Sequence, residues 1–166
     1  MSMLDIFDIG PNKRVGISIN ERDLSLHDLL RQYSNLKSEA DNICAFDIFG
    51  DYPIPLKLLG EGKVHIVDDS GADIFIELVK DRYYETQLKF TGDARTIFIN
   101  GLENVTELYI DANYTKGIAF TPNTTITKLS VMGRELENID IEKLSNLRVL
   151  HIPYTKLTSD DFAMND

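Results

Sequence analysis

Apolar residues in the second half of the chain recur in short triplets, with an apolar residue at the first and third positions. One column of triplets begins at Leu88, Leu108, Leu129 and Leu150. A second column begins at Ile76, Ile97, Ile118 and Ile139. Both columns keep a period of about 21 residues, which falls within the repeat lengths of stacked-coil proteins. Because an apolar residue at every second position is typical of a strand with one buried face, the columns predict a coil of short strands that bury one continuous core.

The last turn of this coil carries a fuller motif, because residues 144–157 read LSNLRVLHIPYTKL. This segment resembles the leucine-rich-repeat consensus L-x-x-L-x-x-L-x-L-x-x-N-x-L, with Thr155 where the family prefers Asn or Cys. Residues 105–113 fit the same pattern and keep the Asn, whereas residues 126–134 place Arg134 at that position. The resemblance covers roughly residues 86–158 and indicates a short, atypical bacterial or viral member of the family. It implies an α/β-solenoid of the leucine-rich-repeat type, with mostly short parallel strands.

The first part of the chain predicts a cap for this coil. Residues 14–19 alternate as a strand, and Ser25 then opens a helix whose first turn contains Asp28. One apolar stripe of the helix consists of Leu26, Leu29, Leu30, Tyr33 and Leu36. Because a solenoid needs an element that covers its end, we predict a strand-plus-helix cap at residues 1–40. A solenoid at 41–158 and an acidic tail at 159–166 complete one structural domain.

Acidic side chains outnumber basic ones, 27 to 17, and give a formal net charge of −10. This charge repels nucleic-acid phosphates and anionic membranes, and it attracts basic proteins. The N-terminal residues carry acids where a signal peptide needs basic residues, and no apolar stretch reaches the length of a membrane span. We therefore predict a cytoplasmic protein that contacts neither nucleic acid nor membrane directly. Its expected partner is a protein, and the charge favours a basic one.

The side chains that could support covalent catalysis do not form a known signature. Cys44 is the single cysteine, so the chain has no internal disulfide and no paired-thiolate metal site. Cys44 could form a nucleophile–base pair with His27, His65 or His151, but no family signature surrounds any of them. An enzyme that uses Cys44 or a histidine is therefore a weaker hypothesis than the two binding functions described below.

Three short polar features are expected to be turns. Residues 60–63 are similar to part of a phosphate loop, but Val64 stands where Ser or Thr is needed. The acidic segment 68–73 offers oxygen ligands for calcium but does not fit the EF-hand pattern. Asn104, Asn113 and Asn123 begin Asn-x-Ser/Thr sequons, and we interpret them as turn residues between strands. We therefore predict no cofactor and no metal.

The residues that alternate with the buried positions are expected to point outward and form one exposed face. In leucine-rich-repeat proteins this strand face is the usual ligand surface. The residues that we predict to contact the partner are Lys89, Glu107, Tyr109, Asp111, Met132, Val149, His151 and Tyr154. Among them Tyr109, Met132 and His151 rank first, because amphipathic and adaptable side chains concentrate binding energy. The leading hypothesis is a non-catalytic protein–protein interaction module that binds through this face.

Acidic residues in the same half of the chain favour an alternative. They could form one negative flank that mimics nucleic-acid charge and occupies the basic site of a host protein. The members of this flank are Glu103, Glu107, Asp111, Glu135, Glu137, Asp140 and Glu142. The alternative is therefore an acidic inhibitor.

Overall fold

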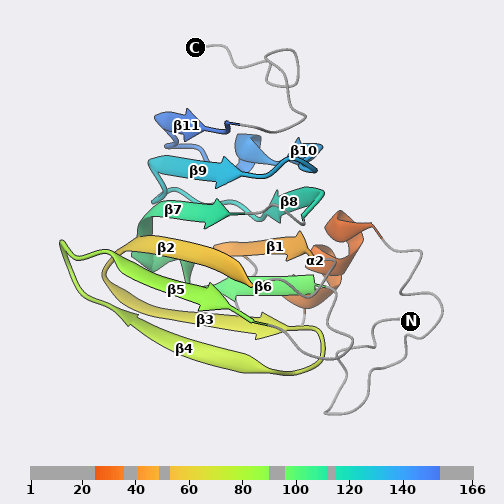
Figure 1. Cartoon of the computed structure of the whole chain (residues 1–166), viewed down its shortest axis with the longest axis horizontal. Coiled ribbons are helices and arrows are strands. Elements are labelled where there is room, and N and C mark those ends of the chain that lie inside the picture. Colours follow the sequence, from red (N-terminus) through yellow and green to blue (C-terminus); the bar gives the residue numbers. More distant parts are fainter. Residues whose placement is uncertain (1–24, 36–40, 49–52, 90–95, 112–114, 154–166) are drawn as a thin grey trace.

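Most of the described chain is β-structure, as the computed structural model in Figure 1 shows. The structure describes residues 25–35, 41–48, 53–89, 96–111 and 115–153. Within these ranges the helical elements are α2 (Leu26–Asn35) and the short 3-10 turns η1 (Leu102–Asn104) and η2 (Ile141–Lys143). The strands are β1 (Ile43–Asp47), β2 (Ile54–Gly60), β3 (Gly62–Asp68), β4 (Asp73–Leu78), β5 (Tyr84–Leu88), β6 (Thr96–Asn100), β7 (Val105–Asp111), β8 (Gly117–Phe120), β9 (Lys128–Met132), β10 (Asn138–Ile139) and β11 (Val149–His151).

The strands form two sheets that share one hydrophobic core (Figure 1). Sheet A has six strands in the order β10-β8-β1-β6-β3-β4, and sheet B has five in the order β11-β9-β7-β2-β5. Phe46 and Ile99 of sheet A are fully buried in the same cluster as Leu58 and Leu108 of sheet B. Each sheet therefore has an inner face that builds the core and an outer face.

From β7 to β11 the chain alternates between the two sheets. Strands β7, β9 and β11 pair in parallel within sheet B, where Tyr109 pairs with Ser130 and Ser130 with His151. In sheet A, β8 and β10 also pair in parallel. Ser130 and His151 are 21 positions apart, and Tyr109 precedes Ser130 by the same interval. The period found in the sequence is thus a true pairing register in this part of the chain.

The prediction of an α/β-solenoid of the leucine-rich-repeat type is wrong, because both sheets contain antiparallel strands. Strand β1 runs antiparallel between β6 and β8, so Phe46 pairs with both Ile97 and Ile118. Strand β2 likewise separates β5 from β7 and pairs antiparallel with both. Residues one period apart in the sequence are therefore not neighbours at these two points. The fold is a mixed, sheet-rich one and not a solenoid.

Helix α2 begins where the sequence predicted, because Ser25 and Asp28 cap it. The Asp28 N–H donates to Ser25 Oγ at 3.1 Å, and Ser25 Oγ donates to Asp28 Oδ2 at 2.9 Å. Its apolar side packs on the outer face of sheet A, where Tyr33 stacks on Phe98 with 4.1 Å between ring centroids. The helix thus covers a sheet face and does not close the end of a coil. The predicted strand at 14–19 and the tail at 159–166 lie outside the described residues.

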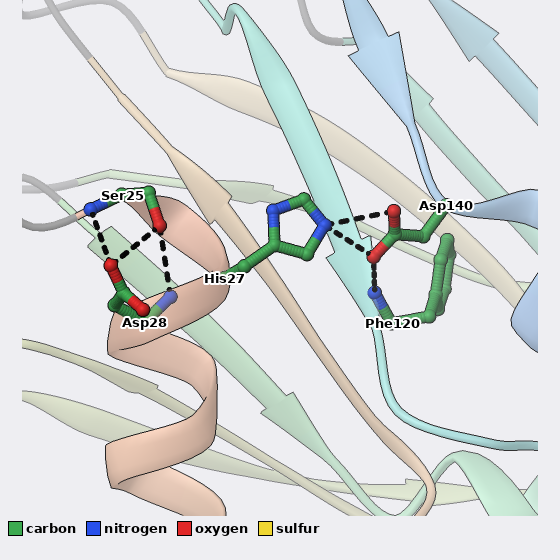
Figure 2. A network of polar contacts seen from close by, with 5 residues as sticks. All are labelled: Ser25, His27, Asp28, Phe120 and Asp140. Atoms are coloured by element: carbon green, nitrogen blue, oxygen red, sulfur yellow. Dashed lines mark hydrogen bonds and ion pairs between the residues drawn. The ribbon is translucent and has the colours of Figure 1, made fainter.

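A polar contact also holds α2 to the C-terminal part of sheet A (Figure 2). The ring nitrogen Nε2 of His27 lies 2.9 and 2.8 Å from the two carboxylate oxygens of Asp140. Asp140 Oδ2 also accepts a hydrogen bond from the Phe120 N–H at 3.4 Å. His27 and Asp140 are 113 positions apart, so this contact fixes the helix to a segment far along the chain.

Among the described residues, no helix is long and apolar enough to span a membrane. The cytoplasmic location stays a prediction.

Candidate functional site on the outer face of sheet B

The outer face of sheet B carries a row of side chains that crosses all five strands. In register, Glu85 pairs with Lys57, Lys57 with Tyr109, Tyr109 with Ser130, and Ser130 with His151. On β2 and β7 the row alternates with the buried positions, and the strand register continues it to Ser130 and His151, so the row stands on the side away from the core. In Figure 1 the five strands lie side by side from β5 to β11. One continuous surface therefore runs across the sheet.

An ordered cluster of aromatic and charged groups surrounds Tyr109. The hydroxyls of Tyr83 and Tyr109 both donate to Glu107 Oε1 at 2.8 Å, and their rings meet edge to face at 6.0 Å. The Lys57 ammonium lies 4.8 Å from the Tyr83 ring centre and 4.4 Å from that of Tyr109. The Lys128 ammonium lies 5.4 Å from the Tyr109 ring centre. These contacts hold the Tyr109 ring in one orientation.

The Glu107 carboxylate changes the acidity of both phenols. The hydrogen bond to Glu107 is the main cause that raises the pKa of Tyr83 to about 12. For Tyr109 the pKa is raised first by burial and then by its own hydrogen bond to Glu107. In both cases the neutral phenol is favoured, because it donates to a negative acceptor. The two phenols therefore remain protonated and bound to Glu107 at neutral pH.

A groove of about 400 Å³ lies next to this cluster. Its lining comes from β2, β5, β7 and β9 and consists of Pro55, Leu56, Lys57, Glu85, Thr86, Gln87, Tyr109, Ile110, Asp111, Ser130 and Met132. Met132 is 39% exposed and supplies an adaptable apolar wall. Asp111 Oδ1 is buried, yet it accepts no hydrogen bond within the described part of the chain. The groove therefore combines apolar walls with a carboxylate oxygen that has no donor.

Ser130 and His151 form a contact that can be compared with a catalytic pair. Ser130 Oγ lies 3.2 Å from His151 Nδ1, and Ser130 is only 8% exposed. A serine nucleophile needs a base that a third group orients. Over residues 25–153, where these are described, no carboxylate contact to the second ring nitrogen of His151 is found. The pair therefore orients the His151 ring across the β9–β11 junction.

The other candidate catalytic residues are separated and have structural contacts. Cys44 is fully buried, and its pKa is raised first by burial and then by the charge of Asp140. His65 stacks on Phe75 at 4.0 Å and contacts Asp73 at 2.9 Å. A buried thiol with a raised pKa is a poor nucleophile. The structure therefore does not assemble the cysteine–histidine pair.

The two glycine- and acid-rich segments are turns. Residues 60–63 span the junction of β2 and β3, and Gly60 is needed because a Cβ there would lie 1.9 Å from Asn104 O. In the acidic segment, Asp68 Oδ1 accepts hydrogen bonds from Ser70 N at 2.8 Å and Ala72 N at 3.0 Å. No group of three or more His, Cys, Asp or Glu residues that could hold a metal occurs within the described ranges.

Most residues predicted to contact a partner do share one face. Those on the outer face of sheet B are Glu107, Tyr109, Asp111, Met132, Val149 and His151. Lys89 borders a separate cavity of about 210 Å³ between β3, β4 and β5. Tyr154 lies outside the described residues. Whether this face binds a partner stays a prediction.

Two important members of the face were not predicted from the sequence. Lys57 comes from β2, and Tyr83 precedes β5, so both belong to the antiparallel part of the sheet. For Lys57 a signal did exist in the sequence, because Ile54, Leu56 and Leu58 alternate with Pro55 and Lys57. For Tyr83 we find no such signal.

The acidic residues of the alternative hypothesis are distributed over both sheets. Glu107 and Asp111 lie on the outer face of sheet B. Asp140, in contrast, contacts His27 on the helix that covers sheet A. These three residues therefore do not form one flank.

Compared with known proteins, the chain matches no family model, no curated protein and no solved structure. The case for a function therefore depends on the residues and the geometry of the chain itself.

Proposed function

We propose that this chain is a non-catalytic binding module whose protein partner contacts the outer face of sheet B. The observation that carries the proposal is the groove beside the ordered Tyr109 cluster, on a face that also exposes apolar side chains. Met132 is 39% exposed and Val149 is 47% exposed, on neighbouring strands of the same sheet. Apolar groups exposed together with aromatic and charged groups are typical of interaction surfaces.

The Tyr109 cluster suits recognition because it is already ordered. The Tyr109 hydroxyl is bound to Glu107, and its ring contacts the ammonium groups of Lys57 and Lys128. A side chain that is fixed before binding loses little conformational entropy in the complex. Tyr109 is therefore the expected centre of the interface, with Met132 as an adaptable neighbour.

The proposal is tested by partner capture from a lysate of the source organism with three proteins. The first is the wild type, and the second is the Tyr109→Ala/His151→Ala variant of the outer face of sheet B. The third is a matched control, His65→Ala/Phe75→Ala, which removes one histidine and one aromatic ring from sheet A. Circular dichroism and thermal unfolding check that all three are folded, and mass spectrometry identifies what each retains.

The expected result is a partner that the wild type and the control retain and that the sheet B variant loses. A partner retained equally by all three proteins contradicts binding through this face, and so does the absence of any partner. Repeating the capture at about 0.5 M salt tests the acidic inhibitor, because exposed charge pairs are screened at that ionic strength. A partner that salt removes but the sheet B variant still retains favours the inhibitor.

A further inference from the structure

We infer that the groove beside Tyr109 receives a basic side chain of the partner, an arginine or a lysine, and that Asp111 binds its positive charge. This inference rests on the proposed function and names the chemistry that the groove selects. It comes from the placement of charges around the groove.

Asp111 is the group in the groove that lacks a donor. Its Oδ1 is buried and accepts no hydrogen bond within the described part of the chain. Asp111 also forms no ion pair with the described residues. A buried acceptor without a donor is destabilising and is uncommon in folded proteins. A guanidinium or ammonium group supplies N–H donors and a compensating charge at once.

Two cations of this face, Lys57 and Lys128, lie near Tyr109. Lys57 lines the groove, and its ammonium lies over the rings of Tyr83 and Tyr109. Lys128 pairs in register with Glu107, two positions before Tyr109, whereas Asp111 follows Tyr109 by two positions. Tyr83 is bound to Glu107. Four positions of an extended strand span about 13 Å, so Glu107 and Asp111 are well separated. The end of the groove at Asp111 is therefore the negative end.

The remaining lining suits the stem of a long basic side chain. Pro55, Met132 and the Tyr109 ring offer apolar surface, and Gln87 offers a further hydrogen-bonding group. The methylene groups of arginine and lysine pack on such surfaces while their charged ends remain in polar contact. The volume of about 400 Å³ lies in the range of about 300–1,000 Å³ that is usual for small-ligand sites. The net charge of −10 also draws basic partners toward the molecule.

The experiment titrates the isotope-labelled full chain with N-acetyl-arginine amide and follows backbone and methionine-methyl resonances by NMR. N-acetyl-glutamate amide and N-acetyl-glutamine amide serve as the acidic and neutral probes. The titrations are repeated with Asp111→Asn and with a matched control, Glu77→Gln, which removes the same charge from an exposed residue of β4 in sheet A.

The arginine probe is expected to shift the resonances of Gln87, Asp111 and Met132 in the wild type and in Glu77→Gln. In Asp111→Asn its affinity should fall about tenfold, which is the size of effect usual for a hydrogen bond to a charged group. Equal affinity for the wild type and Asp111→Asn overturns the role of Asp111. Stronger binding of the glutamate probe overturns the basic occupant, and so does the absence of any shift at these residues.

Failure of this inference is distinguishable from failure of the proposed function. If the sheet B variant loses its partner while the arginine probe leaves the groove unchanged, the face still binds but does not select a basic side chain. If the sheet B variant retains its partner, the proposed function fails whatever the probe does.

Discussion

Asn123 holds together three loop segments at one end of the two sheets, and its removal should be costly. The residue is 2% exposed. Its side-chain Nδ2 lies 3.0 Å from Asn42 Oδ1 and from Leu102 O, and its Oδ1 accepts from Thr125 N at 2.9 Å and Ile126 N at 2.8 Å. The sequence predicted a turn residue here, and the side chain indeed satisfies backbone groups of the turn. It links the segments that precede β1 and β9 with the turn η1.

The magnitude follows from the groups left without partners. In Asn123→Ala, the backbone N–H groups of Thr125 and Ile126 lose their acceptor, whereas Leu102 O keeps the Thr125 hydroxyl at 2.7 Å. Two buried or part-buried donors without acceptors and the lost donation to Asn42 should lower the free energy of unfolding by about 2–4 kcal/mol. With a typical urea m-value of about 2 kcal/mol per molar, the unfolding midpoint should fall by about 1–2 M.

Urea unfolding followed by circular dichroism measures this change, and Asn146→Ala is the matched control. Asn146 is exposed and donates one hydrogen bond, to Thr124 O at 2.6 Å, so its loss should cost about 0.5–1 kcal/mol. If Asn123→Ala costs no more than Asn146→Ala, the reasoning is refuted.

Four further predictions concern the Tyr109 cluster, the contact between His27 and Asp140, and the Cys44 thiol. Glu107→Gln should lower the pKa of Tyr83 from about 12 toward the usual value of about 10, as an absorbance titration of the phenolate can measure; an unchanged titration contradicts the assigned cause. Because the folded state raises this pKa, the stability that Tyr83 contributes is complete below about pH 10 and is lost as the pH rises through 12, which urea unfolding between pH 9 and 12 can follow. A double-mutant cycle of His27→Ala and Asp140→Asn should give a coupling of about 0.5–1 kcal/mol, because His27 is half exposed, and additive effects would show that the contact does not stabilise α2. Cys44 should react with a thiol reagent only at the rate at which the protein opens, and rapid labelling of the native protein would contradict its burial.

The sequence predicted the local structure of β7, β9 and β11 well, because the first and third residues of one triplet at each strand pack in or against the core. The triplets at Leu108, Leu129 and Leu150 lie in β7, β9 and β11, and in each neighbouring pair these leucines are direct register partners. The start of α2 at Ser25 was predicted from its capping residues in the same way. In both cases the signal lies within a few neighbouring residues.

The order of the strands in the two sheets was not predictable from the same pattern. A strand with one buried face alternates identically whether its neighbours run parallel or antiparallel. The column of Ile97 and Ile118 therefore suggested adjacent turns of a coil, although both residues pair with Phe46 of an antiparallel strand between them. Pairing partners that lie so far apart along the chain leave no periodic trace in the sequence.

The candidate binding face was therefore predicted only in part, because sheet B combines parallel strands (β7, β9 and β11) with antiparallel ones (β2 and β5). Tyr109, Met132 and Val149 stand on the parallel strands, so their alternation was enough to predict which face they occupy. The groove, however, exists only where β2 and β5 lie beside β7, since these strands contribute Pro55 and Gln87 to its lining. Strands β7, β9 and β11 alone would present Tyr109, Ser130 and His151 without this groove. The groove of this candidate face therefore depends on the antiparallel strands, which the repeat pattern did not reveal.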